Sequence, residues 1–96
     1  MIRLSSVQAN FLKQGLLQLE PTSEVYLFGS RAHTSERGGD IDILLLTPMK
    51  VTQSRLRALR VAFFQVFGWQ KLDIVNFCLS EEAPFKQIAL QQAVRL

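Results

Sequence analysis

The fold is decided by residues 25–45, VYLFGSRAHTSERGGDIDILL, and by residues 71–77, KLDIVNF, farther along the chain. The first stretch holds two apolar runs separated by a segment rich in Gly, Ser, Thr and charged residues. This pattern predicts two strands, Glu24–Phe28 and Asp40–Thr47, joined by a loop that includes a short helical turn. Residues 70–77 predict a third strand. The near-continuous apolar second half of 40–47 indicates a strand that is buried on both faces.

Helices are predicted before and between these strands. Ser5 can cap a first helix over residues 5–19, and Gln8 stands at the third helical position, as in a capping box. Apolar residues recur there at helical spacing: Leu4, Val7, Phe11, Leu12, Leu16 and Leu19. A second helix is predicted from about Gln53 to Phe67, with the apolar stripe Leu56, Leu59, Phe63, Val66 and Phe67.

The boundaries of the later helices also follow from local chemistry. Thr52 can cap the second helix and Gly68 can end it. A last helix is predicted to begin near Pro84, because proline is favoured at the first helical position, and to run to the terminus. The resulting order α-β-(short α)-β-α-β-α predicts an α/β (α+β) fold with helices packed on a small mixed β-sheet.

Length and composition exclude several classes of protein. The 96 residues, 48% of them hydrophobic, suit one domain over 1–96 and leave no room for a separate substrate-binding domain. No apolar run approaches the roughly 20 residues that span a bilayer, and the N-terminus lacks the pattern of a signal peptide. A single cysteine, Cys78, excludes an internal disulfide and a cysteine-based zinc cage. We therefore expect a cytoplasmic protein.

The charge balance favours anionic partners only slightly. The formal net charge is +3, and the basic residues are scattered except for one concentration at Arg55, Arg57 and Arg60. Binding of single-stranded nucleic acid needs aromatic stacking groups in a basic groove. Most Phe residues fall at core spacing instead, so the sequence argues against a nucleic-acid partner.

Three aspartates interrupt otherwise ordinary strands. Asp40 and Asp42 are two residues apart, which places both carboxylates on one face of a strand. Such a pair suits a hard divalent ion, because Mg²⁺ prefers oxygen ligands and also takes phosphate oxygens. Asp73 is the one further acidic residue placed to complete a pair of metal sites. Two metals about 3.5–4 Å apart can activate the attacking oxygen and stabilise the leaving oxygen of a phosphoryl transfer.

A phosphate-binding element precedes these aspartates. Gly29 follows a strand directly, so the backbone can turn sharply there and approach a ligand. If Ser30 opens a helical turn, its hydroxyl and the free backbone N–H groups point at one spot, which suits a phosphate. Arg31 could neutralise the phosphate charge.

Simpler interpretations of each feature remain open. Gly-Ser after a strand is often only a turn, and Asp-x-Asp at a strand start is often a solvated edge or cap. Asp73 could form an ion pair with Lys71 or with an arginine. His33 could contact a phosphate or a substrate, or be an exposed loop residue without a role.

The stretch VYLFGSRAHTSERGGDIDILL followed by KLDIVNF resembles the minimal nucleotidyltransferase (MNT) group of the DNA polymerase β superfamily. The resemblance implies that Gly29 and Ser30 bind nucleotide phosphates. It also implies that Asp40, Asp42 and Asp73 hold two Mg²⁺ ions. Many such proteins are antitoxins beside a HEPN-domain ribonuclease, and some transfer AMP from ATP to a tyrosine hydroxyl of that partner.

The hypothesis that follows is a Mg²⁺-dependent nucleotidyltransferase that moves AMP from ATP, or a nucleoside monophosphate from another NTP, to a hydroxyl of a HEPN-type partner. One alternative is an antitoxin that neutralises its partner by occlusion, through the wide apolar surface formed by Val61 and Phe64. Another is a nucleotidyltransferase subunit that modifies a small molecule. The sequence leaves the base, the acceptor, a homo-oligomeric state and the role of Arg60 open.

Overall fold

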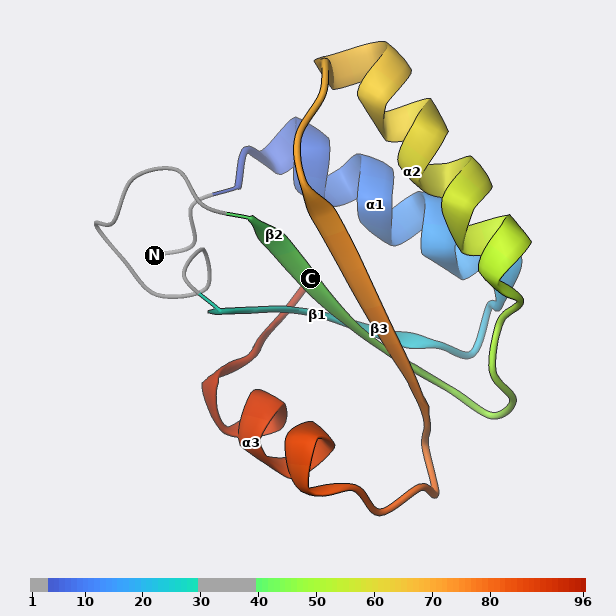
Figure 1. Ribbon diagram of the computed structural model, residues 1–96, viewed down its shortest axis with the longest axis vertical. Helices are drawn as coiled ribbons and strands as arrows, with labels where there is room; N and C mark the ends of the chain where they lie inside the picture. The colour runs from blue at the N-terminus through green and yellow to red at the C-terminus, as the bar shows by residue number, and fades with distance from the viewer. Residues whose placement is uncertain (1–3, 30–39) are drawn as a thin grey trace.

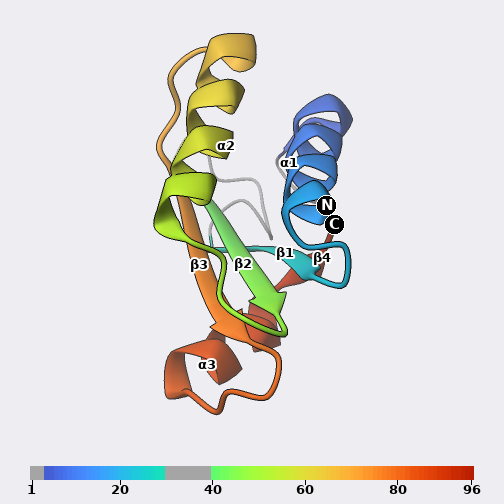
Figure 2. The ribbon, with the colours of Figure 1, turned by 90° about the vertical axis from the view of Figure 1, so that its right-hand side faces the viewer.

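The computed structural model describes residues 4–29 and 40–96. The described residues form α1 (Ser6–Leu19), β1 (Glu24–Phe28), β2 (Ile41–Thr47), α2 (Gln53–Phe67), β3 (Leu72–Cys78), α3 (Pro84–Gln92) and β4 (Val94–Arg95). The strands make one sheet in the order β3-β2-β1-β4. In this sheet β2 pairs with β3 in parallel, whereas β1 is antiparallel to β2 and β4. Helices α1 and α2 lie on one face of the sheet and α3 lies on the other (Figures 1 and 2).

The predicted mixed α/β fold is therefore confirmed, and local chemistry sets most helix ends. Ser5 caps α1, since its Oγ accepts a hydrogen bond from the Gln8 backbone N–H at 3.1 Å. Gly68 ends α2 with a φ of +85°, a conformation that glycine adopts without strain. Thr52 precedes α2 as predicted, but its side chain makes no capping hydrogen bond.

The prediction that the last helix runs to the terminus is wrong. Helix α3 ends at Gln92, and Val94–Arg95 then form β4 on the free edge of β1. The backbone N–H of Leu96 continues this pairing by donating to the Val25 carbonyl at 2.9 Å. The physical reason is that an unpaired strand edge leaves backbone groups without partners, which a short added strand can supply.

The main core lies between the sheet and helices α1 and α2. Alternate residues of the three longer strands point toward these helices, as the two-residue period of a strand requires. They pack against buried side chains of both helices in one cluster, which includes Val25, Leu27, Ile41, Ile43, Leu45, Leu72, Ile74, Leu12, Leu16, Leu56 and Phe63.

A second, smaller core lies on the other face, beneath α3. Leu44 and Leu46 of β2 pack there against Ala89 of α3. Residues 43–47 are all buried, so the prediction that the second half of this strand is buried on both faces is confirmed. Among the described residues, no helix is both long enough and apolar enough to cross a membrane.

Two residues assigned to the apolar helix stripes are instead exposed. Val7 is 66% exposed and Val66 is 61% exposed. At 3.6 residues per turn, Val7 lies about 140° from Leu12 around the axis of α1, and Val66 lies about 80° from Leu56 around that of α2. Val7 therefore turns away from the buried face of α1, whereas Val66 lies at the margin of the buried face of α2.

Replacing Phe63 by alanine should destabilise the fold strongly. The ring is fully buried, with centroids 6.0 Å from Phe11 and 4.8 Å from Phe67. We expect the free energy of unfolding to fall by about 3–5 kcal/mol, measured by urea denaturation. Val66→Ala on the same helix should change it by less than about 0.5 kcal/mol. Equal effects of the two substitutions would show that α2 does not pack through Phe63.

Candidate active site

Asp42 and Asp73 lie side by side on adjacent strands. The parallel pairing of β2 with β3 sets Asp42 opposite Asp73. Their sequence neighbours Ile41, Ile43, Leu72 and Ile74 belong to the core beneath α1 and α2. Because successive residues of a strand point to opposite faces, both carboxylates are on the face that carries α3. Adjacent strands are about 4.8 Å apart, so the two carboxylates are close neighbours.

Gly29 lies next to Asp42 on the side of β2 that faces β1, opposite to β3. It follows β1, whose last residue, Phe28, is paired with Asp42. Its φ is +76°, and a Cβ built on it would lie 2.5 Å from Asp42 Oδ2. A side chain at this position would therefore force the Asp42 carboxylate to move. The positive φ favours glycine here, and the contact adds to that preference.

Asp40 stands immediately before β2 and faces a lysine. The Ile41 backbone N–H donates to the Lys71 carbonyl at 3.0 Å, which aligns the starts of β2 and β3. Lys71 Nζ lies 3.4 Å from Asp40 Oδ2, and both side chains are largely exposed. The sequence left open an ion pair between Lys71 and Asp73, whereas the structure pairs the lysine with Asp40.

Asp42 is the electrostatic centre of the cluster. Burial raises its pKa above the usual value, and the negative charges of Asp73 and Asp40 raise it further. Lys71 acts in the opposite direction and lowers this pKa. The three carboxylates therefore share one electrostatic environment, in which a cation would relieve the repulsion.

The donor set suits a hard divalent cation. As the described residues stand, no group of three or more His, Cys, Asp or Glu side chains is arranged to hold a metal ion. The side chains offer only oxygen donors, which Mg²⁺ prefers.

The rest of the predicted phosphate-binding element lies outside the described residues. Ser30, Arg31 and His33 belong to this part of the chain, as does the predicted short helical turn after Gly29. The described structure thus brings together four predicted site residues: Gly29, Asp40, Asp42 and Asp73.

The apolar surface predicted on α2 is only partly exposed. Val61 is exposed, whereas Phe64 packs against the main core. Trp69, which follows the helix, is 78% exposed. Arg60 is partly buried, and its role stays open.

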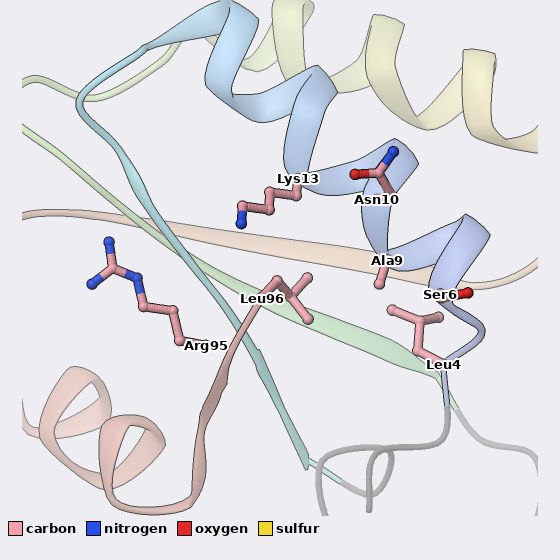
Figure 3. A pocket seen from close by; sticks show the side chains of 7 residues that line it. All are labelled: Leu4, Ser6, Ala9, Asn10, Lys13, Arg95 and Leu96. Carbon is pink, nitrogen blue, oxygen red and sulfur yellow. The ribbon is translucent and has the colours of Figure 1, made fainter.

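A hollow of about 450 Å³ lies away from the aspartates, beside α1. Its lining residues come from the start of α1 and from the C-terminal segment: Leu4, Ser6, Ala9, Asn10, Lys13, Arg95 and Leu96 (Figure 3). β4 is at one edge of the sheet and β3 is at the other. This hollow therefore holds none of the predicted site residues, and the aspartates remain the better candidate for chemistry.

Comparison with known proteins shows the family and the fold of the chain. Residues 10–96 match the family model described as a nucleotidyltransferase domain. A similar fold occurs in the solved structure of the tri-AMPylated Shewanella oneidensis HEPN toxin in complex with MNT antitoxin. The TM-score is 0.69 at 20% identity, and the match covers 96% of this chain and 71% of that one. A search of curated proteins gave no match.

Gly29→Ala should cost more stability than the same change at Gly68. Both glycines have a positive φ, but only at Gly29 would the new Cβ collide with another group, the Asp42 carboxylate. We expect each substitution to cost about 1–3 kcal/mol for the backbone conformation, with a further loss at Gly29 alone. Denaturant unfolding of both variants measures the difference.

The origin of that extra loss can be isolated with a double-mutant cycle. Asp42→Ala removes the carboxylate that the new Cβ would meet. In that background, Gly29→Ala should cost about as much as Gly68→Ala does. If the extra loss persists without the Asp42 carboxylate, the close approach is not its cause.

Asp42→Asn should stabilise the metal-free protein at neutral pH. Because the pKa of Asp42 is raised in the folded state, the folded protein binds more protons than the unfolded chain. Stability is therefore lost as the pH rises from the unfolded aspartate value, about 3.9, through the raised folded pKa. We expect the variant to melt at a higher temperature than the wild type at pH 7 in EDTA, and at about the same temperature near pH 3.

The control for this pH dependence is Glu82→Gln, which removes a carboxylate at an exposed position. In this control, the difference between the melting temperatures at pH 7 and near pH 3 should be almost the same as in the wild type. A lower melting temperature for Asp42→Asn at pH 7 would contradict a destabilising charge at that position.

Proposed function

The chain belongs to the nucleotidyltransferase domain family, and on this premise we propose that it is a Mg²⁺-dependent nucleotidyltransferase that acts as an antitoxin. In this proposal it moves AMP from ATP to a hydroxyl group of a HEPN-type protein partner. The similar solved structure supports this choice of partner and group, because it is described as an AMPylated HEPN toxin in complex with MNT antitoxin.

The observation that carries the proposal is the position of Asp42 between two functional neighbours. Asp73 pairs with it across β2 and β3, and Gly29 approaches its carboxylate from the end of β1. A phosphate-binding turn beside a pair of carboxylates is the arrangement that phosphoryl transfer requires, because it places phosphate and cation in contact.

Each carboxylate has a distinct task in this mechanism. Asp40 and Asp42 would hold one cation and Asp73 a second, and Asp73 would accept the proton of the attacking hydroxyl. Bound Mg²⁺ would neutralise the phosphate charge and lower the pKa of the hydroxyl. The hydroxyl oxygen bonds to the α-phosphorus, the bond to the bridging oxygen breaks, and pyrophosphate leaves. Catalysis then consists of positioning and charge stabilisation.

Gly29, Ser30 and Arg31 have the binding role in this proposal. The absence of a side chain at Gly29 lets the backbone reach the nucleotide next to Asp42. Ser30 contributes its hydroxyl and backbone N–H to the phosphates, and Arg31 neutralises their charge. Lys71 competes with the cation for Asp40, since it already forms an ion pair with that carboxylate.

A second candidate function is neutralisation of the partner by occlusion, without chemistry. Exposed apolar side chains on α2 and just after it favour a protein interface: Val61, Val66 and Trp69. The two functions make opposite predictions for a variant that binds the nucleotide and cannot transfer it.

Asp73→Asn should abolish AMP transfer and leave ATP binding within about threefold of the wild type, since Gly29, Asp40 and Asp42 are untouched. Purified protein is incubated with Mg²⁺, α-labelled ATP and the HEPN-type protein encoded beside it. Label on the partner is measured after gel separation, and ATP binding is measured by calorimetry. We expect a loss of at least about 100-fold in transfer, because a group that stabilises the transition state is removed.

The matched control is Glu82→Gln, which removes one exposed carboxylate that lies outside β2 and β3 and should transfer label normally. Full transfer by Asp73→Asn would contradict the role of Asp73. If the wild type transfers no label from any NTP, and the Asp73→Asn variant still neutralises the partner, occlusion is the function.

A further inference from the structure

The face of the sheet that carries Asp42 and Asp73 also carries a cluster of three aromatic rings, Phe28, Phe77 and Phe85. The ring centroid of Phe85 lies 5.9 Å from that of Phe28 and 6.2 Å from that of Phe77. Phe28 is paired with Asp42 across β1 and β2. The aromatic cluster therefore begins directly beside the central carboxylate of the candidate active site.

Phe85 remains 49% exposed, although it contacts two other rings. It is the second residue of α3, on the same side of the sheet as the carboxylates. Of the aromatic residues that the structure describes on this face, Phe28, Phe77, Tyr26 and Phe85, it is the exposed one. A planar ligand can therefore reach its ring.

The neighbouring residue fixes the position of Phe85. Lys86 is only 6% exposed, and its ammonium group donates to three backbone carbonyls of the turn that joins β3 to α3. The distances are 3.2 Å to Cys78, 2.8 Å to Leu79 and 2.8 Å to Glu81. This buried cation ties the first turn of α3 to the end of β3. Phe85 is thus held in place before any ligand binds, which lowers the entropic cost of binding.

The distance between the Phe85 ring and the carboxylates suits the length of a nucleoside. Phe85 bridges Phe28, which is level with Asp42, and Phe77, which is level with Leu46. Its ring therefore lies between these two levels of the sheet, and residues two apart along a strand are separated by about 6.5–7 Å. A base is one ribose away from its α-phosphate, which is a comparable span. A nucleotide whose phosphates lie at Gly29 and Asp42 could place its base on this ring.

We propose that Phe85, supported by Phe28, is the stacking platform for the nucleobase and gives the site a preference for purine nucleotides. This inference rests on the proposed nucleotidyltransferase function. Every base has a flat π-face that stacks on an aromatic side chain. A purine has the larger face and gains more from the contact. Phosphate groups gain nothing from it.

Other aromatic residues are poorer candidates for this role. Tyr26 lies on the same face, but its hydroxyl donates to Glu24 at 2.8 Å and the Arg95 guanidinium lies 5.8 Å above its ring. Trp69 is more exposed than Phe85, but its ring packs at 6.4 Å against Phe64 of α2, in the opposite layer. Trp69 therefore provides a matched control.

The test compares two ligands of the full chain in the presence of Mg²⁺. ATP carries a base, and inorganic tripolyphosphate carries only the phosphates. Phe85→Leu keeps an apolar side chain against Phe28 but removes the flat ring. We expect its affinity for ATP, measured by calorimetry, to fall about tenfold. Its affinity for tripolyphosphate should stay within about twofold of the wild-type value.

Two further variants exclude a general effect on the fold. Phe85→Trp should keep tight ATP binding, because it retains a flat aromatic ring. Trp69→Leu should leave the affinity for both ligands unchanged, because that ring lies in the other layer. Melting temperatures of all variants establish that α3 remains folded.

The purine preference is tested by comparing ATP with CTP. The ratio of ATP affinity to CTP affinity should fall toward one in Phe85→Leu.

The outcomes separate this inference from the function on which it rests. If the wild type binds ATP more tightly than tripolyphosphate and Phe85→Leu keeps that difference, the platform is overturned and the nucleotide site stands. Equal loss of both ligands in Phe85→Leu would also overturn the platform, because the defect would then be structural. If the wild type binds neither ligand, the proposed function fails first.

Discussion

The parallel pairing of β2 with β3 holds two like charges together, and the rest of the structure depends on it. Asp42 and Asp73 are level on adjacent strands, and the pKa of Asp42 is raised first by burial and then by this repulsion. The pairing is stable because Ile41 and Ile43, on either side of Asp42, are fully buried. Burying one such side chain stabilises the fold by about 1.5–3 kcal/mol. The same strand therefore carries both the repulsive charge and the apolar residues that offset it.

Sequence reasoning succeeded where local chemistry allows one solution. Ser5 and Gly68 mark helix ends because a capping hydroxyl and a positive φ each suit few residue types. It failed for β4, because Val94 and Arg95 become a strand only through the unpaired edge of β1, which the local sequence does not contain. The exposure of Val66 was also missed, since an apolar residue at the margin of a helix stripe is buried only if a neighbouring element reaches it.

The candidate site could likewise be predicted from the sequence only in part. Spacing alone predicts that Asp40 and Asp42 share a face, because that depends only on the period of a strand. The contact of Gly29 with the Asp42 carboxylate and the pairing of Lys71 with Asp40 depend on strand register. Register is set by the whole buried face, over contacts distant in sequence. The motif therefore predicts which residues belong to the candidate site, and the packed sheet determines which of the described ones touch.

Register also makes the core and the site inseparable. A shift of one residue in β2 would turn Ile41 and Ile43 away from the helices and bury Asp42 in their place. The free energy of burying the apolar residues thus selects the one register in which the carboxylates face away from α1 and α2. In that register Gly29 is beside Asp42, and a side chain at position 29 would displace the Asp42 carboxylate. The packing of the opposite face therefore assembles the candidate active site, and no separate interaction is needed to bring its described residues together.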